Sequence, residues 1–387
     1  MSCCPCLTPS SPVEEPMQLK ATSLASRAGQ RLRVALVQFH PKLGQIQANM
    51  ARAKELCRQI PPHSVDLVCL PEMAFSGYGF PNAEAIRPYL EIPKIGPTSL
   101  FCAEVARNLG CCVIAGYPEQ LSLDEVAGMD ARLQDNPPES HVSAPQPIGA
   151  NSAALFGPAG EWLGGYRKTN LFPVDKTWAK QGTGFATFTI PLRSRVPHQI
   201  TTARISVGIC NDLNPAPTHN RHAAKIPYEI ASYALEQKAD ALILLNAWLE
   251  SGKYPEEKQD LETIGFWSER LRPLWDVEDP TSSKFAQAQM NALAAGAAPP
   301  PPQMQMQMQI PAAGASPQAK EMLVAICNRG GSENETRYAG SSVVFRMRPS
   351  AGQEGNLRAV LGREEEGLLI YPPVDEDWSV DKDLESE

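Results

Sequence analysis

The chain has 387 residues, and its 35 Lys and Arg against 43 Asp and Glu give a formal net charge of −8. Apolar residues make up 43% of the chain, which is enough to build a core and excludes wholesale disorder. The net acidity, without a concentrated basic stripe, excludes nucleic acid as the main partner. No apolar run reaches the roughly 18 residues of a membrane span, no secretory signal is visible, and several of the ten cysteines lie inside apolar runs, so we expect a cytoplasmic protein with reduced thiols and no membrane partner.

The apolar pattern predicts that strands and helices alternate along the chain. Near-continuous apolar runs are typical of strands buried on both faces, and apolar residues at three- and four-residue spacing are typical of helices. In chain order we expect strand 33–39, helix 47–60, strand 66–70, a helix through 101–109, strands 111–115, 152–156, 162–166 and 205–209, helix 227–237, and strands 241–245, 323–327 and 342–345, the last two closing the core. Such alternation indicates an α/β fold with helices covering its sheets.

Composition divides the chain into one folded domain and several less regular segments. Residues 1–30 have the character of a loose tail, and 120–149 lose all periodicity, which indicates a surface insertion. A low-complexity stretch rich in Pro, Gln and Met fills 278–320, and an acidic tail follows at 372–387. We therefore expect a single domain made of 31–277 and 321–371.

Polar residues follow three of the predicted strands at the point where each strand ends. Glu72 comes after 66–70, Lys168 after 162–166, and Cys210 directly after 205–209. In open α/β sheets the strand ends carry the active site. Each residue alone is more often a solvated turn residue or an inert buried thiol, but together they predict one site.

A glutamate, a lysine and a cysteine have a clear joint use in hydrolysing an amide. A thiolate is a strong nucleophile when a neighbouring cation lowers its pKa, so we expect Lys168 to favour the thiolate of Cys210 and to donate to the developing oxyanion. The backbone N–H of Asn211 is the second oxyanion donor. Glu72 would accept the thiol proton, return it to the leaving amine, and then activate water. This chemistry requires no metal and no cofactor.

The residues around these three groups resemble the nitrilase (carbon–nitrogen hydrolase) superfamily. The resemblance rests on CLPEMAFSGY at 69–78, GYRKTNLF at 165–172 and GICNDLNP at 208–215. It implies a four-layer αββα sandwich, as a single domain with insertions, and assigns the catalytic Glu, Lys and Cys to Glu72, Lys168 and Cys210.

Further segments resemble one branch of that superfamily, the protein N-terminal amidases, which deamidate N-terminal Asn and Gln of other proteins. They are DKTW at 175–178, NAWL at 246–249, FWSERLRPL at 266–274 and CNRGG at 327–331. The branch usually has Met where this chain has Asn211. The resemblance implies hydrolysis of the side-chain amide of N-terminal Asn and Gln through a Cys thioester, which would feed N-degron protein turnover.

Four further residues are candidates around the catalytic set. The resemblance implies a second acid that holds the lysine, for which we choose Asp175, although a surface-loop role is open. Trp178 and Trp248 are candidates for the pocket wall, with core packing as the alternative. Asp212 would fix the turn after Cys210 or face the substrate amine.

Alternatives to this function stay open at the level of sequence. The same three groups would serve a general small-amide or carbamoyl hydrolase, and a catalytically silent homologue would be a binding scaffold. A homodimer is also open. A CxxC spacing at Cys3–Cys6 has no second pair, so we expect no metal there.

Overall fold

The computed structural model describes residues 32–128, 146–193, 201–216, 228–276, 321–348 and 356–373. All of them belong to one compact unit that begins at Leu32. The tail 1–30 with its Cys3–Cys6 spacing, the whole low-complexity stretch 278–320, and residues 374–387 of the acidic tail lie outside the described residues. In the described residues no helix has the length and apolar character needed to cross a membrane.

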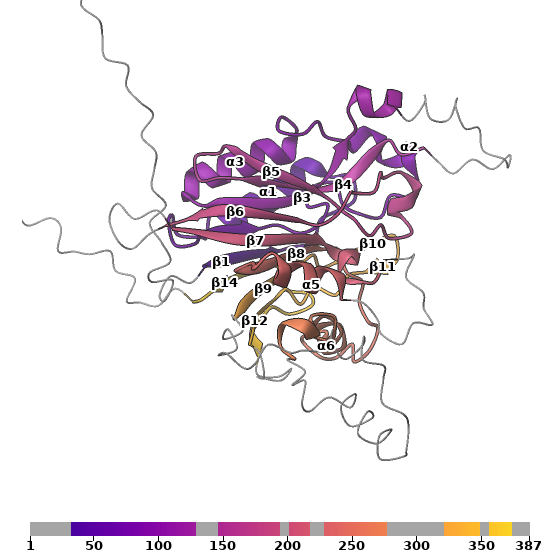
Figure 1. Ribbon diagram of the computed structural model, residues 1–387. Helices are drawn as coiled ribbons and strands as arrows, with labels where there is room; N and C mark the ends of the chain where they lie inside the picture. The colour runs from indigo at the N-terminus through magenta and orange to yellow at the C-terminus, as the bar shows by residue number, and fades with distance from the viewer. Residues whose placement is uncertain are drawn as a thin grey trace, which may run out of the picture. The chain divides into compact units, whose positions relative to one another are not determined.

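Two six-stranded sheets form the centre of the structure (Figure 1). The first has the order β14-β1-β2-β3-β4-β5, with β1, β2 and β3 parallel and the outer pairs antiparallel. Its strands are β1 (Val34–Gln38), β2 (Leu67–Cys69), β3 (Cys112–Gln120), β4 (Gly149–Phe156), β5 (Trp162–Arg167) and β14 (Gly367–Tyr371).

The second sheet repeats this plan. Its order is β13-β12-β9-β8-β7-β6, with β7, β8 and β9 parallel and antiparallel strands on both sides. Its strands are β6 (Ala186–Leu192), β7 (Thr201–Ile209), β8 (Ala241–Asn246), β9 (Met322–Asn328), β12 (Val343–Met347) and β13 (Leu357–Val360). The central strands β8 and β9 are buried along their whole length, which is why they consist almost entirely of apolar residues.

Helices cover the outer face of each sheet. Figure 1 shows α1 (Ile46–Cys57) and α3 (Pro97–Leu109) on the first sheet, and α5 (Glu229–Glu236) and α6 (Leu261–Arg270) on the second. The remaining short elements are α2 (Ala83–Ile86), η1 (Arg87–Tyr89), η2 (Asp175–Thr177), η3 (Cys210–Leu213), η4 (Arg272–Leu274), β10 (Ser332–Glu333) and β11 (Thr336–Arg337). Helix α3 has Pro97 at its start and ends at Gly110, whose φ of +64° suits a glycine.

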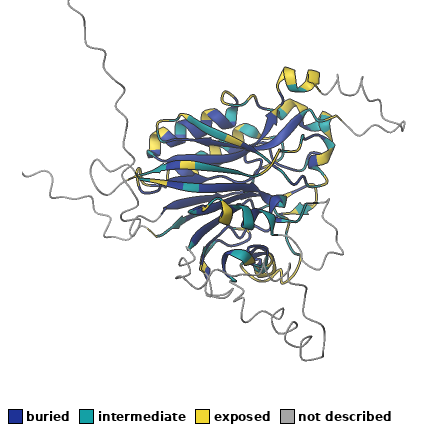
Figure 2. Ribbon diagram, in the orientation of Figure 1, coloured by how far each residue is buried: buried dark blue, intermediate teal, exposed yellow. Residues whose placement is uncertain are grey.

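Three apolar clusters lie between these four layers. One joins residues of both sheets, the second joins the first sheet to α1 and α3, and the third joins the second sheet to α5 and α6. Figure 2 shows the sheets as the most buried part of the molecule. The predicted αββα sandwich is therefore confirmed.

Several predicted boundaries were wrong. Two further strands, β13 and β14, follow 342–345, and β14 closes the first sheet beside β1. Strand β6 was missed altogether, because its sequence ATFTIPL contains a proline that weakens the strand pattern. Strand β3 continues to Gln120 and β4 begins at Gly149, so the segment without regular pairing is shorter than 120–149.

A buried glutamate at the start of α3 makes stability depend on pH. Glu91 accepts hydrogen bonds from the Thr98 N–H and hydroxyl, each at 2.8 Å. Burial raises the pKa of Glu91 from 4.5 to about 7, against the opposing effect of these bonds. Because the folded state holds this proton more tightly than the unfolded state, the contribution of Glu91 to stability is largest below pH 4.5 and is lost as the pH rises to about 7.

We expect Glu91→Gln to remove this dependence. The shift corresponds to roughly 3 kcal/mol, so the free energy of unfolding of the wild type should fall relative to that of the variant between pH 4.5 and 7. Urea denaturation of both proteins across that range measures the difference. The exposed residue Glu84 provides the control, since Glu84→Gln should give a pH profile parallel to the wild type.

Candidate active site

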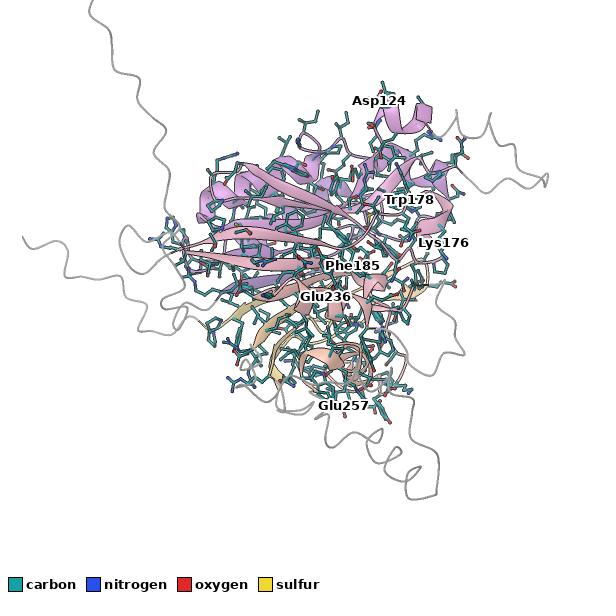
Figure 3. All side chains as sticks on the ribbon, viewed as in Figure 1. Asp124, Lys176, Trp178, Phe185, Glu236 and Glu257 are labelled. Atoms are coloured by element: carbon teal, nitrogen blue, oxygen red, sulfur yellow. The ribbon has the colours of Figure 1, made fainter. Side chains whose placement is uncertain are left out.

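The three predicted groups lie at one end of the sandwich, each just beyond a strand. Glu72 follows β2, Lys168 follows β5 and Cys210 follows β7. Two of these strands belong to the first sheet and one to the second. Figure 3 shows Lys176 and Trp178, from the segment after Lys168, at this same end of the molecule, on the right of the view.

The Lys168 ammonium is completely buried between two carboxylates. Its Nζ donates to Glu72 Oε1 at 2.7 Å and to Asp175 Oδ2 at 2.6 Å, and all three side chains are 0% exposed. Burial opposes the charge on Lys168, but the carboxylates of Asp175 and Glu72 outweigh it and raise the pKa of Lys168 above its ordinary value. An ammonium has three N–H donors. The two carboxylates accept from two of them, so the third N–H of Lys168 is available to a substrate.

Glu72 is held at both of its oxygens. Besides Lys168, Asn151 Nδ2 donates to Oε1 at 2.7 Å, and the Ala247 N–H donates to Oε2 at 2.8 Å. Burial raises the pKa of Glu72 above its ordinary value, Lys168 opposes this rise, and Asp175 adds to it. A carboxylate with a raised pKa is suited to accept and return a proton.

Asn151 links the two carboxylates. Its Nδ2 also donates to Asp175 Oδ1 at 3.1 Å, and the Phe172 N–H donates to Asp175 Oδ2 at 2.9 Å. Two carboxylates around one lysine repel each other, and a shared amide donor reduces that repulsion. Asp175 therefore lies inside the site against Lys168, and not in a surface loop.

Cys210 is held in a strained backbone conformation. Its φ is +45°, where a residue with a Cβ is disfavoured, and its N–H donates to Asn246 Oδ1 at 3.1 Å. The residue is 7% exposed and borders the cluster between the sheets. A positive φ directly after a strand turns the side chain away from the strand direction, as a nucleophile at a sharp turn requires.

As predicted, Lys168 favours the thiolate of Cys210, but burial of the sulfur outweighs its effect. Burial raises the pKa of Cys210 well above its ordinary value, and Glu72 adds to the rise, while Lys168 opposes it only in part. Burial of the sulfur is the largest cause, and the two carboxylates around Lys168 offset part of the attraction of its charge. Cys210 therefore rests as a thiol, and needs a base when it attacks.

Asp212 fixes the turn that carries Cys210. It accepts from the Ile209 N–H at 2.8 Å, and from three groups of the segment after β5, namely the Tyr166 hydroxyl at 2.7 Å and the N–H groups of Thr169 and Asn170 at 3.0 and 2.7 Å. Burial raises the pKa of Asp212 to about 6, against these hydrogen bonds. We predicted that Asp212 either fixes the turn after Cys210 or faces the substrate amine, and these contacts are those of a residue that fixes the turn.

Asn211 lies in the first turn of η3. Its Nδ2 donates to the Asn170 carbonyl at 3.1 Å, and its Oδ1 accepts from Asn214 at 2.8 Å. The first N–H groups of a helix have no partner within that helix. The side chain therefore anchors the turn, while the N–H remains the candidate oxyanion donor.

The two candidate tryptophans are packed against other apolar groups. Trp178 is 2% exposed in a cluster with Met73 and Tyr78. Trp248 lies 5.6 Å from Phe266 and 6.0 Å from Trp267, measured between ring centroids. These contacts account for the packing of both rings, and a role in the pocket wall stays a prediction.

Two amide side chains were missed by the sequence reasoning. Asn151 and Asn246 are both 0% exposed, and both lie in buried strands that are apolar apart from them and Ser152 in β4. A polar residue inside such a run is the signal that would have found them, because a buried amide needs partners. Which partners it has is visible only in the folded chain.

Comparisons with known proteins agree with this geometry. A family model described as carbon–nitrogen hydrolase matches residues 33–216. The protein N-terminal amidase of Schizosaccharomyces pombe is 26% identical over 359 residues, which cover 88% of this chain and 98% of that protein. A crystal structure of an N-terminal amidase superposes with a TM-score of 0.65 at 19% identity, covering 88% of this chain and 96% of that one, and the same values hold for its complexes with Gln-Gly and Asn-Glu peptides. Residues 33–216, which contain the Glu72, Lys168 and Cys210 motifs, therefore form a carbon–nitrogen hydrolase domain.

Proposed function

We propose that this protein hydrolyses the side-chain amide of an N-terminal Asn or Gln residue of peptides and proteins, releasing ammonia and leaving Asp or Glu. The observation that carries the proposal is the buried set of Lys168, Glu72 and Asp175 beside the strained Cys210. A fully buried lysine held by two carboxylates has a large desolvation cost. A catalytic use explains why such a costly group is placed beside a thiol.

The first half of the reaction forms a thioester. The Cys210 sulfur attacks the amide carbon while Glu72 takes the thiol proton, and the carbonyl oxygen becomes an oxyanion. The free N–H of Lys168 and the N–H of Asn211 stabilise that oxyanion. Glu72 then passes its proton to the nitrogen, the carbon–nitrogen bond breaks, and ammonia leaves.

The second half releases the product. Glu72, again a carboxylate, takes a proton from a water molecule that attacks the thioester carbon. The carbon–sulfur bond breaks, the sulfur regains the proton from Glu72, and the side chain leaves as a carboxylic acid. Burial raises the pKa of Glu72, which makes this carboxylate a better acceptor for the thiol proton than an ordinary one.

The choice of substrate rests on the relatives. The S. pombe relative is a protein N-terminal amidase, matched over nearly its whole length, and the structural relative has been crystallised with peptides that begin with Asn and Gln. A general small-amide hydrolase would use the same catalytic groups. The two differ in whether the free α-amine of the peptide is required.

An ammonia-release assay with three peptides separates these functions. We expect ammonia from an Asn-peptide and a Gln-peptide, and at least about a hundredfold less from the acetylated Asn-peptide, because a buried site that pairs an amine rejects a substrate lacking it. Equal turnover of the acetylated and free peptides would assign the protein to general amide hydrolysis. No ammonia from any peptide or simple amide would indicate a binding scaffold.

A further inference from the structure

Tyr78 carries a buried hydroxyl whose hydrogen-bonding capacity is not used. The residue is 6% exposed, and its Oη has no hydrogen-bond partner within the described residues. A buried hydroxyl without a partner costs stability, and such groups in folded proteins require an explanation. The catalytic scheme above does not use this hydroxyl.

The ring of Tyr78 lies against the catalytic lysine. Its centroid is 5.4 Å from Lys168 Nζ, within the range of a cation–π contact. Burial, followed by the negative charges of Asp175 and Glu72, raises the pKa of Tyr78 well above its ordinary value. The hydroxyl therefore keeps its proton beside the catalytic groups and is able to donate it in a hydrogen bond.

A buried ion pair holds the loop that carries Tyr78. Glu333 Oε2 accepts from the N–H groups of Tyr78 and Gly79, at 3.0 and 2.9 Å, and also from the Tyr338 hydroxyl at 3.0 Å. The guanidinium of Arg329, itself fully buried, pairs with Glu333. Four groups thus hold the Glu333 carboxylate against the backbone of Tyr78 and Gly79.

The glycine before Tyr78 is required for that approach. Gly77 has a φ of +78°, and a Cβ placed on it would lie 2.5 Å from Glu333 Oε1 and 2.8 Å from the Leu43 backbone. Only a residue without a side chain lets the carboxylate come so close. The segment around Arg329 and Glu333 lies beyond the 33–216 match to the family model, so this support comes from a separate part of the chain.

We propose that Tyr78 is a further catalytic residue, whose hydroxyl hydrogen-bonds the N-terminal Asn or Gln residue of the bound substrate, and that Glu333 is a positioning residue that acts through it. The inference rests on the proposed function, because the substrate supplies the missing partner. Three observations support this role. The Tyr78 hydroxyl has no partner within the described residues, its ring contacts Lys168, and Glu333 fixes its backbone, as is expected for a pre-positioned hydroxyl that binds a ligand.

Tyr78→Phe tests the hydroxyl without disturbing the ring. We expect kcat/KM for an Asn-peptide to fall about tenfold to a hundredfold, as for the loss of one substrate hydrogen bond. The Tm should stay the same or rise, because the variant removes a buried hydroxyl that has no partner in the folded protein. A structural hydroxyl would behave in the opposite way, with a lower Tm.

Ser99→Ala is the matched control. Ser99 in α3 is also fully buried, with a hydroxyl that has no partner within the described residues, but it lies in the helix layer. Its removal should leave kcat/KM unchanged. Wild-type kcat/KM in Tyr78→Phe, or a loss that follows a lower Tm, would overturn the inference. A wild type that releases no ammonia from Asn- or Gln-peptides would instead overturn the proposed function, and this inference with it.

A double-mutant cycle tests the role of Glu333. Glu333→Gln alone should lower both Tm and kcat/KM, because it weakens the pair with Arg329 and the bonds to the loop. If Glu333 acts through Tyr78, the same substitution should cost much less kcat/KM in the Tyr78→Phe background. Equal losses in both backgrounds would show that Glu333 has only a structural role.

Discussion

Replacement of Cys210 with alanine should abolish ammonia release from an Asn-peptide, lowering kcat by at least about a thousandfold. The reason is that the thioester cannot form without the sulfur, and the remaining groups hold no other nucleophile in the scheme. The measurement is a steady-state ammonia assay at saturating peptide with wild type and variant. Cys102→Ala is the control, since Cys102 is a fully buried thiol in α3 and should leave kcat unchanged.

Comparing Cys210→Gly with Cys210→Ala distinguishes the catalytic role of the sulfur from the backbone strain at this position. Glycine normally destabilises a protein relative to alanine by roughly 0.5–1 kcal/mol, but at a φ of +45° the order should reverse, because alanine keeps the clash of its Cβ. We expect both Cys210→Ala and Cys210→Gly to be inactive, with the higher Tm in Cys210→Gly. A higher Tm for the alanine variant would contradict the strained turn, and residual wild-type activity in either would contradict the nucleophile.

Replacement of Lys168 with methionine should remove activity and also destabilise the fold. Breaking a buried ion pair from one side leaves uncompensated charge and costs about 3–5 kcal/mol, and here Glu72 and Asp175 both lose their partner. Without the opposing charge of Lys168, burial raises the pKa of Glu72 further, so the loss of stability should grow as the pH rises above the ordinary carboxylate range. Urea denaturation at several pH values measures this dependence.

Removal of one carboxylate tests whether the charges are the cause. The double variant Lys168→Met with Asp175→Asn should be more stable than Lys168→Met alone, because one unpaired charge has gone, although both are inactive. The control is Lys253→Met, whose ammonium pairs with Glu262 on the exposed surface and should change the free energy of unfolding by less than about 1 kcal/mol. If Lys168→Met were as stable as the wild type, Lys168 could not be paired with the buried carboxylates of Glu72 and Asp175.

The strand and helix pattern was largely readable from local sequence. Each buried strand is a short apolar run, as in β8 and β9, and each outer helix has an apolar stripe, since these patterns follow from burial on two faces or on one. The strand ends also predicted where Glu72, Lys168 and Cys210 would lie. The resemblance of the motifs to the nitrilase superfamily then predicted the αββα order of the four layers, which the spacing of apolar residues alone does not predict.

What the tertiary structure decided is the set of contacts between distant segments. The pairing of β14 with β1, the bridge from Asn151 to Glu72 and Asp175, and the support of Tyr78 by Glu333 join residues between 24 and 337 positions apart. No local pattern encodes such contacts, because they depend on how the two sheets are ordered and stacked. The pKa of Cys210 is the clearest case: the sequence placed a cation beside a thiol, but only the packed site shows that burial outweighs this cation and raises the pKa of the thiol.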